Sequence, residues 1–235
     1  MQQCRDIEDK YPLSPNNWYK CHQYKIAPKV MHNMKHAWTF GIGKDARHEG
    51  WIRYFNHDVV VQTFDPTEYS KETIKFENKT VLWRDRDAGV KGKPKIQWFR
   101  SAFHPSASKL QFYTTDPGRR CYSLVNHDPK HVVHQYRVKT NNIAGFLEKH
   151  LTPDYIKFDV EGMWYDFCKE VLSNNLPVTQ VVGEFEMYMG DTDTQFERLN
   201  TIIQLFKEAG FKVFTNRRLT TDMVELAFVK KEYVQ

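Results

Sequence analysis

The sequence predicts an α/β fold built on a mostly parallel sheet with helices on both faces. Segments with strand character alternate along the chain with segments whose apolar residues recur at helical spacing, the pattern of strand–helix–strand units. The last two apolar segments are joined only by "RRLTTD", so they should pair antiparallel and leave the last strand reversed in the sheet. Two glycines follow the first strand, at the turn where open α/β sheets bind ligands.

The first elements of the sheet are expected in the stretch that begins near residue 36. "AWTFG" has the character of a short buried strand, and "DARHEGWIRYFNH" carries its large apolar residues on one side of a helix. "DVVVQTFD" is a second apolar strand, which ends on Asp65, and "TVLWRD" is expected to be the third. This half of the chain therefore predicts three strands and one helix.

The middle of the chain predicts a hairpin insertion at about residues 108–128, on an edge of the sheet. "KLQFYTTDPGRRCYSLVNHD" alternates apolar and polar residues and has turn residues at 116–118. "TNNIAGFLEKH" follows as a helix, for which Thr140 or Asn141 is the expected cap.

The remaining segments complete the alternation. "YIKFDV" and "TQVVGEFEM" are expected strands, and "GMWYDFCKEVLSNN" is an expected helix between them. "TQFERLNTIIQLFKEAG" is amphipathic and should stop at its final glycine, Gly210. The last two expected strands are "FKVFTN" and "MVELAFVKK".

Length and composition indicate one compact domain. The 235 residues are 40% hydrophobic and 14% aromatic, enough for a large core. Residues 1–35 mix Pro, Asn and charges without a period, so they are expected to form an irregular arm packed on a single domain at 36–235. The oligomeric state is left open.

Charge and hydropathy limit the partners and the compartment. Lys and Arg exceed Asp and Glu by 34 to 29, and the scattered excess argues against nucleic acid as a partner. No apolar run has the length of a membrane span, and "MQQCRDIEDKYPL" lacks the features of a signal peptide. The chain as given should be soluble, and cytoplasmic, or lumenal if an upstream anchor was removed.

The four cysteines do not predict a metal site. They form no CxxC pair, and no cluster of histidines has the spacing of zinc ligands. Cys168 has the character of a buried helix residue, and Cys4 and Cys21 are able to pair if the chain matures in an oxidising compartment.

The glycine turn favours an adenosyl ligand over a dinucleotide. Gly41 and Gly43 lack the third glycine of the dinucleotide motif, because Ala46 and Arg47 stand in its place. Asp65 lies about twenty residues later, where a carboxylate can accept both hydroxyls of a ribose. The alternative is that Asp65 only caps the turn that follows it.

Three segments, in this order and spacing, carry a family resemblance. "WTFGIGKD", "VVVQTFDPT" and "DYIKFDVEGMWYDF" resemble methyltransferases of the FkbM type, within the class I S-adenosylmethionine-dependent superfamily. The resemblance runs from about residue 38 to about residue 187. It implies a Rossmann-like sheet of seven strands with the last antiparallel, S-adenosylmethionine as cofactor, and methyl transfer as the reaction.

The resemblance also implies roles for particular residues. It implies that Phe40, Gly41, Ile42 and Gly43 form the loop under the cofactor's methionine and ribose. It implies that Asp65 accepts the ribose hydroxyls and that Asp85 contacts the adenine. Asp159, Glu161 and Glu184 are implied to face the cofactor's amino-acid end and the acceptor pocket, and Asp159 also counts as a cofactor contact. Trp164 stands where the family pattern often has a further acid, and it is expected to be a core residue.

The resemblance implies O-methylation of a hydroxyl on a small-molecule or carbohydrate acceptor. Two alternatives stay open at this point. One is a non-catalytic cofactor-binding module, for which Trp164 and the missing third glycine speak. The other is RNA methylation, because Lys44, Asp159 and Glu184 resemble part of the Lys-Asp-Lys-Glu set of RNA ribose methyltransferases, although no second lysine is identifiable.

Overall fold

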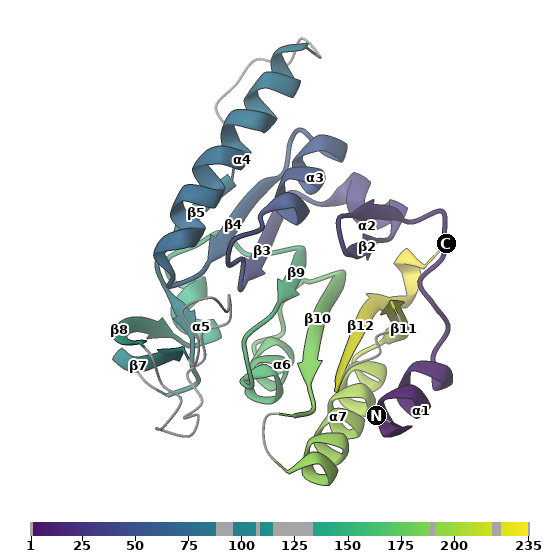
Figure 1. Cartoon of the computed structure of the whole chain (residues 1–235). Coiled ribbons are helices and arrows are strands. Elements are labelled where there is room, and N and C mark those ends of the chain that lie inside the picture. Colours follow the sequence, from purple (N-terminus) through teal and green to yellow (C-terminus); the bar gives the residue numbers. More distant parts are fainter. Residues whose placement is uncertain are drawn as a thin grey trace.

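A seven-stranded sheet forms the centre of the molecule (Figure 1). The computed structural model describes residues 2–87, 96–106, 109–114, 134–188, 191–217 and 222–234. The strand order across the sheet is β11 (Phe211–Arg217), β12 (Met223–Lys230), β10 (Gln180–Glu186), β9 (Tyr155–Phe158), β3 (His36–Phe40), β4 (Val60–Phe64) and β5 (Ile96–Phe99).

One strand of this sheet is reversed. β12 pairs antiparallel with both β10 and β11, whereas the pairs from β10 across to β5 are all parallel. The short link before β12 allows no crossover helix, which is the reason for the reversal. The predicted fold class, a mostly parallel α/β sheet with the last strand antiparallel, is therefore confirmed.

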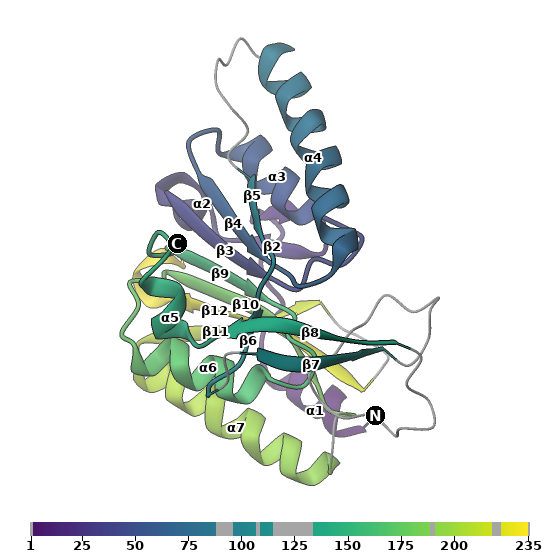
Figure 2. The same ribbon diagram turned by 90° about the vertical axis from the view of Figure 1, so that its left-hand side faces the viewer.

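Helices cover both faces of the sheet (Figure 2). Neighbouring residues on a strand point to opposite faces, so Trp38 packs in one core and Ala37 in the other. The first core is covered by α1 (Gln2–Lys10), α5 (Ile143–Leu147), α6 (Trp164–Ser173) and α7 (Thr192–Glu208); the second by α2 (Pro28–Asn33), α3 (Arg47–Phe55) and α4 (Glu68–Asp87).

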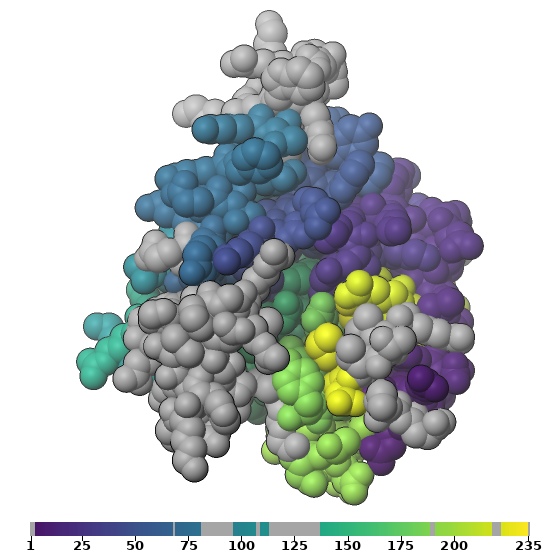
Figure 3. Space-filling model, in the orientation of Figure 1, coloured from purple at the N-terminus to yellow at the C-terminus, as the bar shows by residue number. Residues whose placement is uncertain are grey.

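The N-terminal residues are ordered, and the expectation of an irregular arm over 1–35 is wrong. They form α1, a hairpin of β1 (Tyr19–Cys21) and β2 (Tyr24–Ile26), and α2. The side chains of α1 fill part of the first core and those of the hairpin and α2 part of the second, and the surface of these elements lies beside the C-terminal strands (Figure 3). Strands of three residues are too short to show a period, so sequence patterning cannot reveal them.

A buried amide holds this hairpin on the sheet. Asn216, on β11, accepts a hydrogen bond from the Lys25 amide (2.9 Å) and donates to the Gln23 carbonyl (2.9 Å) and to Glu225 Oε2 (2.9 Å). Glu225 Oε1 in turn accepts from the Arg217 guanidinium. The position of the hairpin therefore depends on a residue near the other end of the chain.

The third strand of the sheet lies later than expected. Residues 80–85, predicted as a strand, belong to α4, and the third strand is β5. A short apolar run with β-branched residues fits either element, and its continuity with the preceding helical turns decides in favour of helix. Asp85 therefore lies on a helix, and the reason for expecting it beside adenine no longer holds.

The predicted hairpin insertion forms a sheet of its own (Figure 2). β7 (Lys109–Thr114) pairs antiparallel with β8 (His134–Asn141), and β8 also pairs with β6 (Ala102–Phe103). The second strand thus lies beyond the expected limit at 128, and the turn expected at 116–118 falls outside the described residues. Because β8 runs to residue 141, α5 is capped by Asn142, which accepts from the Gly145 amide, and not by Thr140 or Asn141.

Cys4, Cys21 and Cys168 are buried free thiols, so Cys4 and Cys21 are not paired. The described residues contain no helix that is both long and apolar enough to cross a bilayer, and no group of three side chains placed to hold a metal ion.

We expect Asn216→Ala to lower the free energy of unfolding by about 2–4 kcal/mol, because it removes three hydrogen bonds and leaves buried groups unpaired. Urea denaturation measures this change. Lys212→Ala, at an exposed position of the same strand, is the control and should change the stability by no more than about 0.5 kcal/mol. Equal effects of the two substitutions would contradict the role given to Asn216.

Candidate functional site

A cavity of about 280 Å³ lies at the carboxyl ends of the central strands. This is where open α/β sheets bind their ligands. On one side its walls come from the β1–β2 turn, the loop between β3 and α3, and the start of α3. The remaining walls come from the turns after β4 and β9, from β10, and from the separate sheet of β6, β7 and β8. The lining residues are 22–24, 40–45, His48, Glu49, 64–67, Ala102, Phe103, Phe112, Lys157, 159–161 and Glu184.

The floor of the cavity is the glycine loop, which we define as residues 41–46 between β3 and α3. Gly41 and Gly43 both have a positive φ, +69° and +57°. A Cβ on Gly41 would stand 1.9 Å from the carbonyl oxygen of Asp159, so the loop can approach β9 only because this residue has no side chain. All four residues predicted for this loop, Phe40, Gly41, Ile42 and Gly43, line the cavity, and Phe40 is the last residue of β3.

Lys157 supports this loop from β9 and was missed by sequence reasoning. The residue is only 5% exposed, and its Nζ donates to the carbonyl oxygens of Phe40 (3.1 Å) and Gly41. A lysine inside the apolar run "YIKFDV" was the signal that a buried charge needs partners. Its ammonium fixes two successive carbonyls of the chain at the point where β3 becomes the loop.

Asp65 lies at the end of β4, on the other side of the loop. Its Oδ2 accepts from the amides of Ile42 (2.7 Å) and Gly43 (2.8 Å). Its Oδ1 accepts from the Thr67 amide (2.8 Å) and hydroxyl (2.5 Å), which is the turn contact considered as the alternative role. Both carboxylate oxygens thus accept hydrogen bonds from the protein. The predicted contact with the ribose hydroxyls stays a prediction.

The three predicted acids meet at the cavity. Asp159 and Glu161 follow the end of β9, and Glu184 lies on β10. Glu161 has a φ of +45° in the turn beyond the strand, so strand alternation does not send it to the opposite face from Asp159. Burial raises the pKa of Asp159 well above its usual range, and Glu184 and Glu161 raise it further, whereas the Lys157 ammonium opposes the shift.

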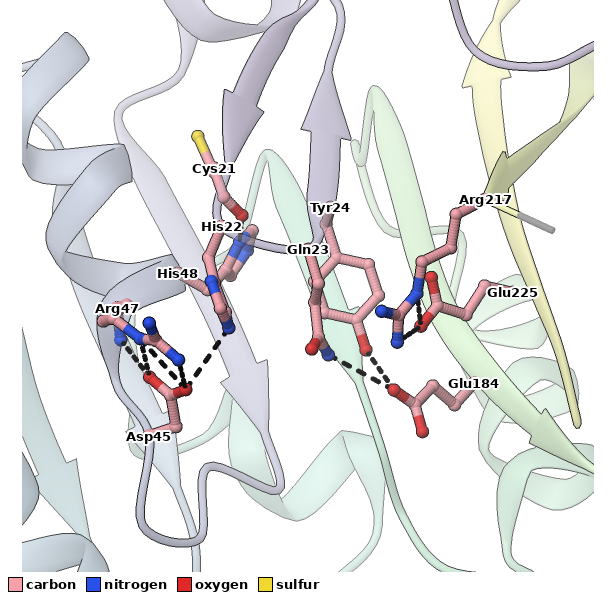
Figure 4. Close-up of polar contacts among 10 residues, drawn as sticks. All are labelled: Cys21, His22, Gln23, Tyr24, Asp45, Arg47, His48, Glu184, Arg217 and Glu225. Atoms are coloured by element: carbon pink, nitrogen blue, oxygen red, sulfur yellow. Dashed lines mark hydrogen bonds and ion pairs between the residues drawn. The ribbon is translucent and has the colours of Figure 1, made fainter. Parts of the chain in front are cut away.

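The N-terminal hairpin holds Glu184 in place (Figure 4). Glu184 Oε1 accepts from Gln23 Nε2 (3.2 Å) and from the Tyr24 hydroxyl (3.1 Å). Burial and the nearby Glu184 raise the pKa of Tyr24, so the phenol remains a hydrogen-bond donor. Gln23 and Tyr24 were missed because the segment that carries them was expected to be irregular.

The rim of the cavity carries an ion pair. Asp45 contacts His22 Nε2 at 3.2 Å and Arg47 Nη2 at 2.6 Å (Figure 4). Hydrogen bonds from Arg47 lower the pKa of Asp45 to about 2, although partial burial opposes this shift. Asp45 is therefore ionised at neutral pH, and it links the hairpin turn to the start of α3.

His48, on α3, lies in the cavity wall and joins α3 to β1 and β9. Its Nδ1 lies 2.9 Å from the Cys21 carbonyl oxygen and its Nε2 3.0 Å from the Tyr155 hydroxyl. Only a protonated Nδ1 can bond to a carbonyl, so Nε2 of the neutral ring accepts from Tyr155. Burial lowers the pKa of His48 to about 3, and its carbonyl partner only partly opposes this.

Trp164 is a core residue, as expected. It is 1% exposed, and its ring centroid lies 5.2 Å from that of Phe185 on β10. The position where the family pattern often has an acid therefore packs against the sheet.

Residues 90–213, more than half of the chain, match the Methyltransferase FkbM domain. The turn after β9 lies inside this segment, whereas the glycine loop and Asp65 precede it. No curated protein sequence matches the chain.

Many solved structures resemble the chain, and three of them illustrate the range. One is an O-methyltransferase from Bacillus cereus in complex with SAH, with a TM-score of 0.48 and 9% identity; the match covers 97% of this chain and 90% of that one. Another is a precorrin-6y C5,15-methyltransferase from Geobacter metallireducens, with a TM-score of 0.47, 10% identity and coverage of 95% of this chain and 96% of that one. A third is the fibrillarin pre-rRNA processing protein of Methanococcus jannaschii, with a TM-score of 0.49, 8% identity and coverage of 88% of this chain and 70% of that one. At these scores the likenesses say nothing about a methyl acceptor.

The buried His48 predicts a loss of stability in acid. Its pKa in the folded protein, about 3, lies below the ordinary 6.5, so only the unfolded chain takes up this proton as the pH falls from 6.5 toward 3. Between pH 7 and pH 4 the parent should lose about 3 kcal/mol more stability than His48→Gln. Urea denaturation at both pH values measures the difference.

His32→Gln, at an exposed position on α2, is the matched control and should follow the parent. If the parent and His48→Gln lose the same stability between the two pH values, His48 is not buried as a neutral ring.

Proposed function

The chain belongs to the Methyltransferase FkbM domain family, and on that premise we propose that it methylates an oxygen, a hydroxyl on a sugar-like or other small acceptor. The cofactor of this family is S-adenosylmethionine. One observation carries the proposal: the glycine loop and the three acids, far apart in sequence, line the same cavity.

The residues at the cavity suit this cofactor in two respects. The glycine loop lies directly against the end of β9 at Gly41, so its backbone and the acids after β9 border one cavity, and the aromatic rings of Phe40, Phe64 and Phe103 supply apolar surface for an adenosyl group. The cofactor carries an ammonium and a sulfonium, and the acids at the cavity supply the opposite charge. When bound, it supplies a methyl group that is already activated for transfer to a nucleophile.

The protein's task in such a reaction is to orient the acceptor and hold its proton. We assign Asp159 to the side of the cavity near the cofactor and Glu161 to orienting the acceptor. Glu184 is the third candidate, because Gln23 and Tyr24 both donate to its Oε1 and thereby fix the direction of its carboxylate. A carboxylate held in this way can orient an acceptor hydroxyl or accept its proton.

RNA methylation is the second candidate, and one observation favours it. Lys157 lines the cavity together with Lys44, Asp159 and Glu184, and so supplies the second lysine that the sequence did not identify. Its ammonium, however, is bonded to two carbonyls of the chain. A methyl-transfer assay against carbohydrate, small-molecule and RNA acceptors, with product mass as the readout, separates the two functions.

S-adenosylmethionine and its demethylated product should raise the melting temperature, because a ligand of the folded state stabilises it by mass action, by about 2.7 kcal/mol at a hundred times its Kd. NAD is the control and should have no effect, since the glycine loop lacks the third glycine of the dinucleotide motif. Stabilisation by NAD but by neither adenosyl ligand would refute the assignment of the cavity.

Amide substitutions test the acids. Asp159→Asn, Glu161→Gln and Glu184→Gln keep the shape of each side chain but remove its ability to take or give up a proton, so an enzyme that depends on the carboxyl group should lose about 10²- to 10⁴-fold in rate. Steady-state rates with the acceptor found in the assay measure this loss. Glu197→Gln, at an exposed position on α7, is the control. An acid whose amide variant turns over at the parental rate has no part in the reaction.

A further inference from the structure

We propose that His22 is the base that takes the proton of the acceptor hydroxyl, and that Asp45 is the residue that positions its imidazole ring. The inference rests on the proposed function, because it concerns the oxygen that receives the methyl group. It goes beyond that function by adding a catalytic residue on the N-terminal hairpin, a segment in which the sequence analysis placed no site residue.

The first observation is the position of His22 and its backbone conformation. The residue lies in the turn between β1 and β2 and lines the cavity. Its φ of +56° is a left-handed conformation that costs a residue with a side chain about 1–2 kcal/mol. The next two residues, Gln23 and Tyr24, donate to Glu184 Oε1. The turn therefore brings the imidazole to the same cavity as this acid (Figure 4).

The second observation is the ion pair with Asp45, which determines which ring nitrogen can accept a proton. Asp45 Oδ2 lies 3.2 Å from His22 Nε2. Hydrogen bonds from Arg47 lower the pKa of Asp45 to about 2, so its carboxylate is ionised and can only accept. In the neutral ring Nε2 therefore carries the hydrogen and Nδ1 has the lone pair. Within the described part of the chain, no group donates a hydrogen bond to Nδ1.

The third observation is that two other titratable groups at the cavity are less suited to this task. His48 uses both ring nitrogens, on the Cys21 carbonyl and the Tyr155 hydroxyl. Burial raises the pKa of Asp159 well above its usual range, which favours the form that already carries a proton. An imidazole is ordinarily a stronger base than a carboxylate by about two pKa units, and a general base is most efficient when its pKa lies near the pH of the reaction.

The charges around His22 keep its ring neutral at pH 7. Partial burial lowers its pKa below the ordinary 6.5, and Arg47 and Arg217 lower it further, whereas Asp45 raises it. His48, on the helix that follows the glycine loop, adds no charge at this pH because its own pKa is about 3. The ring is therefore mostly unprotonated before the reaction, and it is able to accept a proton.

The proton transfer balances as follows from these groups. His22 Nδ1 forms a bond to the acceptor's proton as the O–H bond breaks, and the electron pair of that bond stays on the oxygen. The oxygen forms the bond to the methyl carbon, and the electron pair of the broken C–S bond stays on the sulfur. The imidazolium then lies beside the Asp45 carboxylate. Since the His22 side chain is 28% exposed, the proton can pass from it to water.

An NMR titration of the imidazoles, on the protein without ligand, tests the pair of His22 and Asp45. We expect a pKa of His22 below 6.5, and ¹⁵N shifts that place the hydrogen of the neutral ring on Nε2. Asp45→Asn removes the anion that raises this pKa, so the pKa should fall further. A parental ring with its hydrogen on Nδ1, or a pKa that does not fall in Asp45→Asn, would overturn the assignment.

His22→Asn and His22→Gly test catalysis, and both new residues tolerate a positive φ. Each should lower kcat by about 10²- to 10⁴-fold with the acceptor found in the assay. The calorimetric affinity for S-adenosylhomocysteine should stay within about 3-fold of the parental value. Imidazole added to His22→Gly should raise its rate by about 10-fold or more. His32→Gln, at an exposed position outside the cavity, is the control and should have the parental rate.

The pH dependence of kcat/KM separates a base from a residue with only a structural role. In the parent the rate should be lost as the pH falls through the His22 pKa measured by NMR, because the base must be unprotonated. This loss should disappear in His22→Asn and move to lower pH in Asp45→Asn.

The possible failures can be told apart. A parent that does not bind S-adenosylhomocysteine would refute the proposed function. An active parent with an equally active His22→Asn variant would refute only the role of His22. A large loss of affinity for S-adenosylhomocysteine in both His22 variants would make the residue a cofactor contact, and it too would overturn the proposal.

Discussion

The close approach of two backbones, at Gly41 and Asp159, is the constraint on which the cavity depends. No atom can stand where a Cβ of residue 41 would lie, because the carbonyl oxygen of Asp159 is 1.9 Å from that point. The loop therefore lies directly against the end of β9, and this contact brings its carbonyls within reach of Lys157 and its next amides within reach of Asp65. The acid that follows β9 then faces the same space as the loop. One missing side chain thus sets the position of both halves of the site.

Burial and charge act together at this site. The cavity-lining acids outnumber the lysines among the described residues, and burial makes the ionised form of Asp159 costly. Neighbouring groups of the protein offset the cost of burying a charge at two of the acids. Asp45 forms an ion pair with Arg47, and Asp65 accepts four hydrogen bonds. Glu184 is held by Gln23 and Tyr24 on the N-terminal hairpin. The positions of the charges at the cavity therefore depend on residues such as Arg47, Gln23 and Tyr24, to which the sequence analysis assigned no role.

Long periodic segments were predictable from the sequence, and short or buried polar features were not. The helix that ends before Gly210 and the strand pair joined by "RRLTTD" follow from spacing alone. The β1–β2 hairpin does not, because three residues per strand show no period, and its burial depends on contacts with residues near 216. Residues 80–85 have strand-like composition but continue a helix, so tertiary context overrides the local preference. At the site, the glycines and Asp65 were found by their position after strands, and Asp159, Glu161 and Glu184 through the family resemblance. Lys157, Gln23 and Tyr24 were not, because their roles exist only once distant segments meet.

The bond between the hairpin and Asn216 has a consequence for the order of events during synthesis. Gln23 and Tyr24 emerge from the ribosome long before the amide that holds their hairpin on the sheet, which lies 191 positions after Lys25. A contact of such long range forms late, after its loop-closure entropy has been overcome. The wall beside Glu184 is therefore incomplete on the nascent chain until β11 has been made. Until then the growing polypeptide contains the glycine loop and the acids after β9, but it lacks the Asn216 side chain that holds the hairpin beside Glu184.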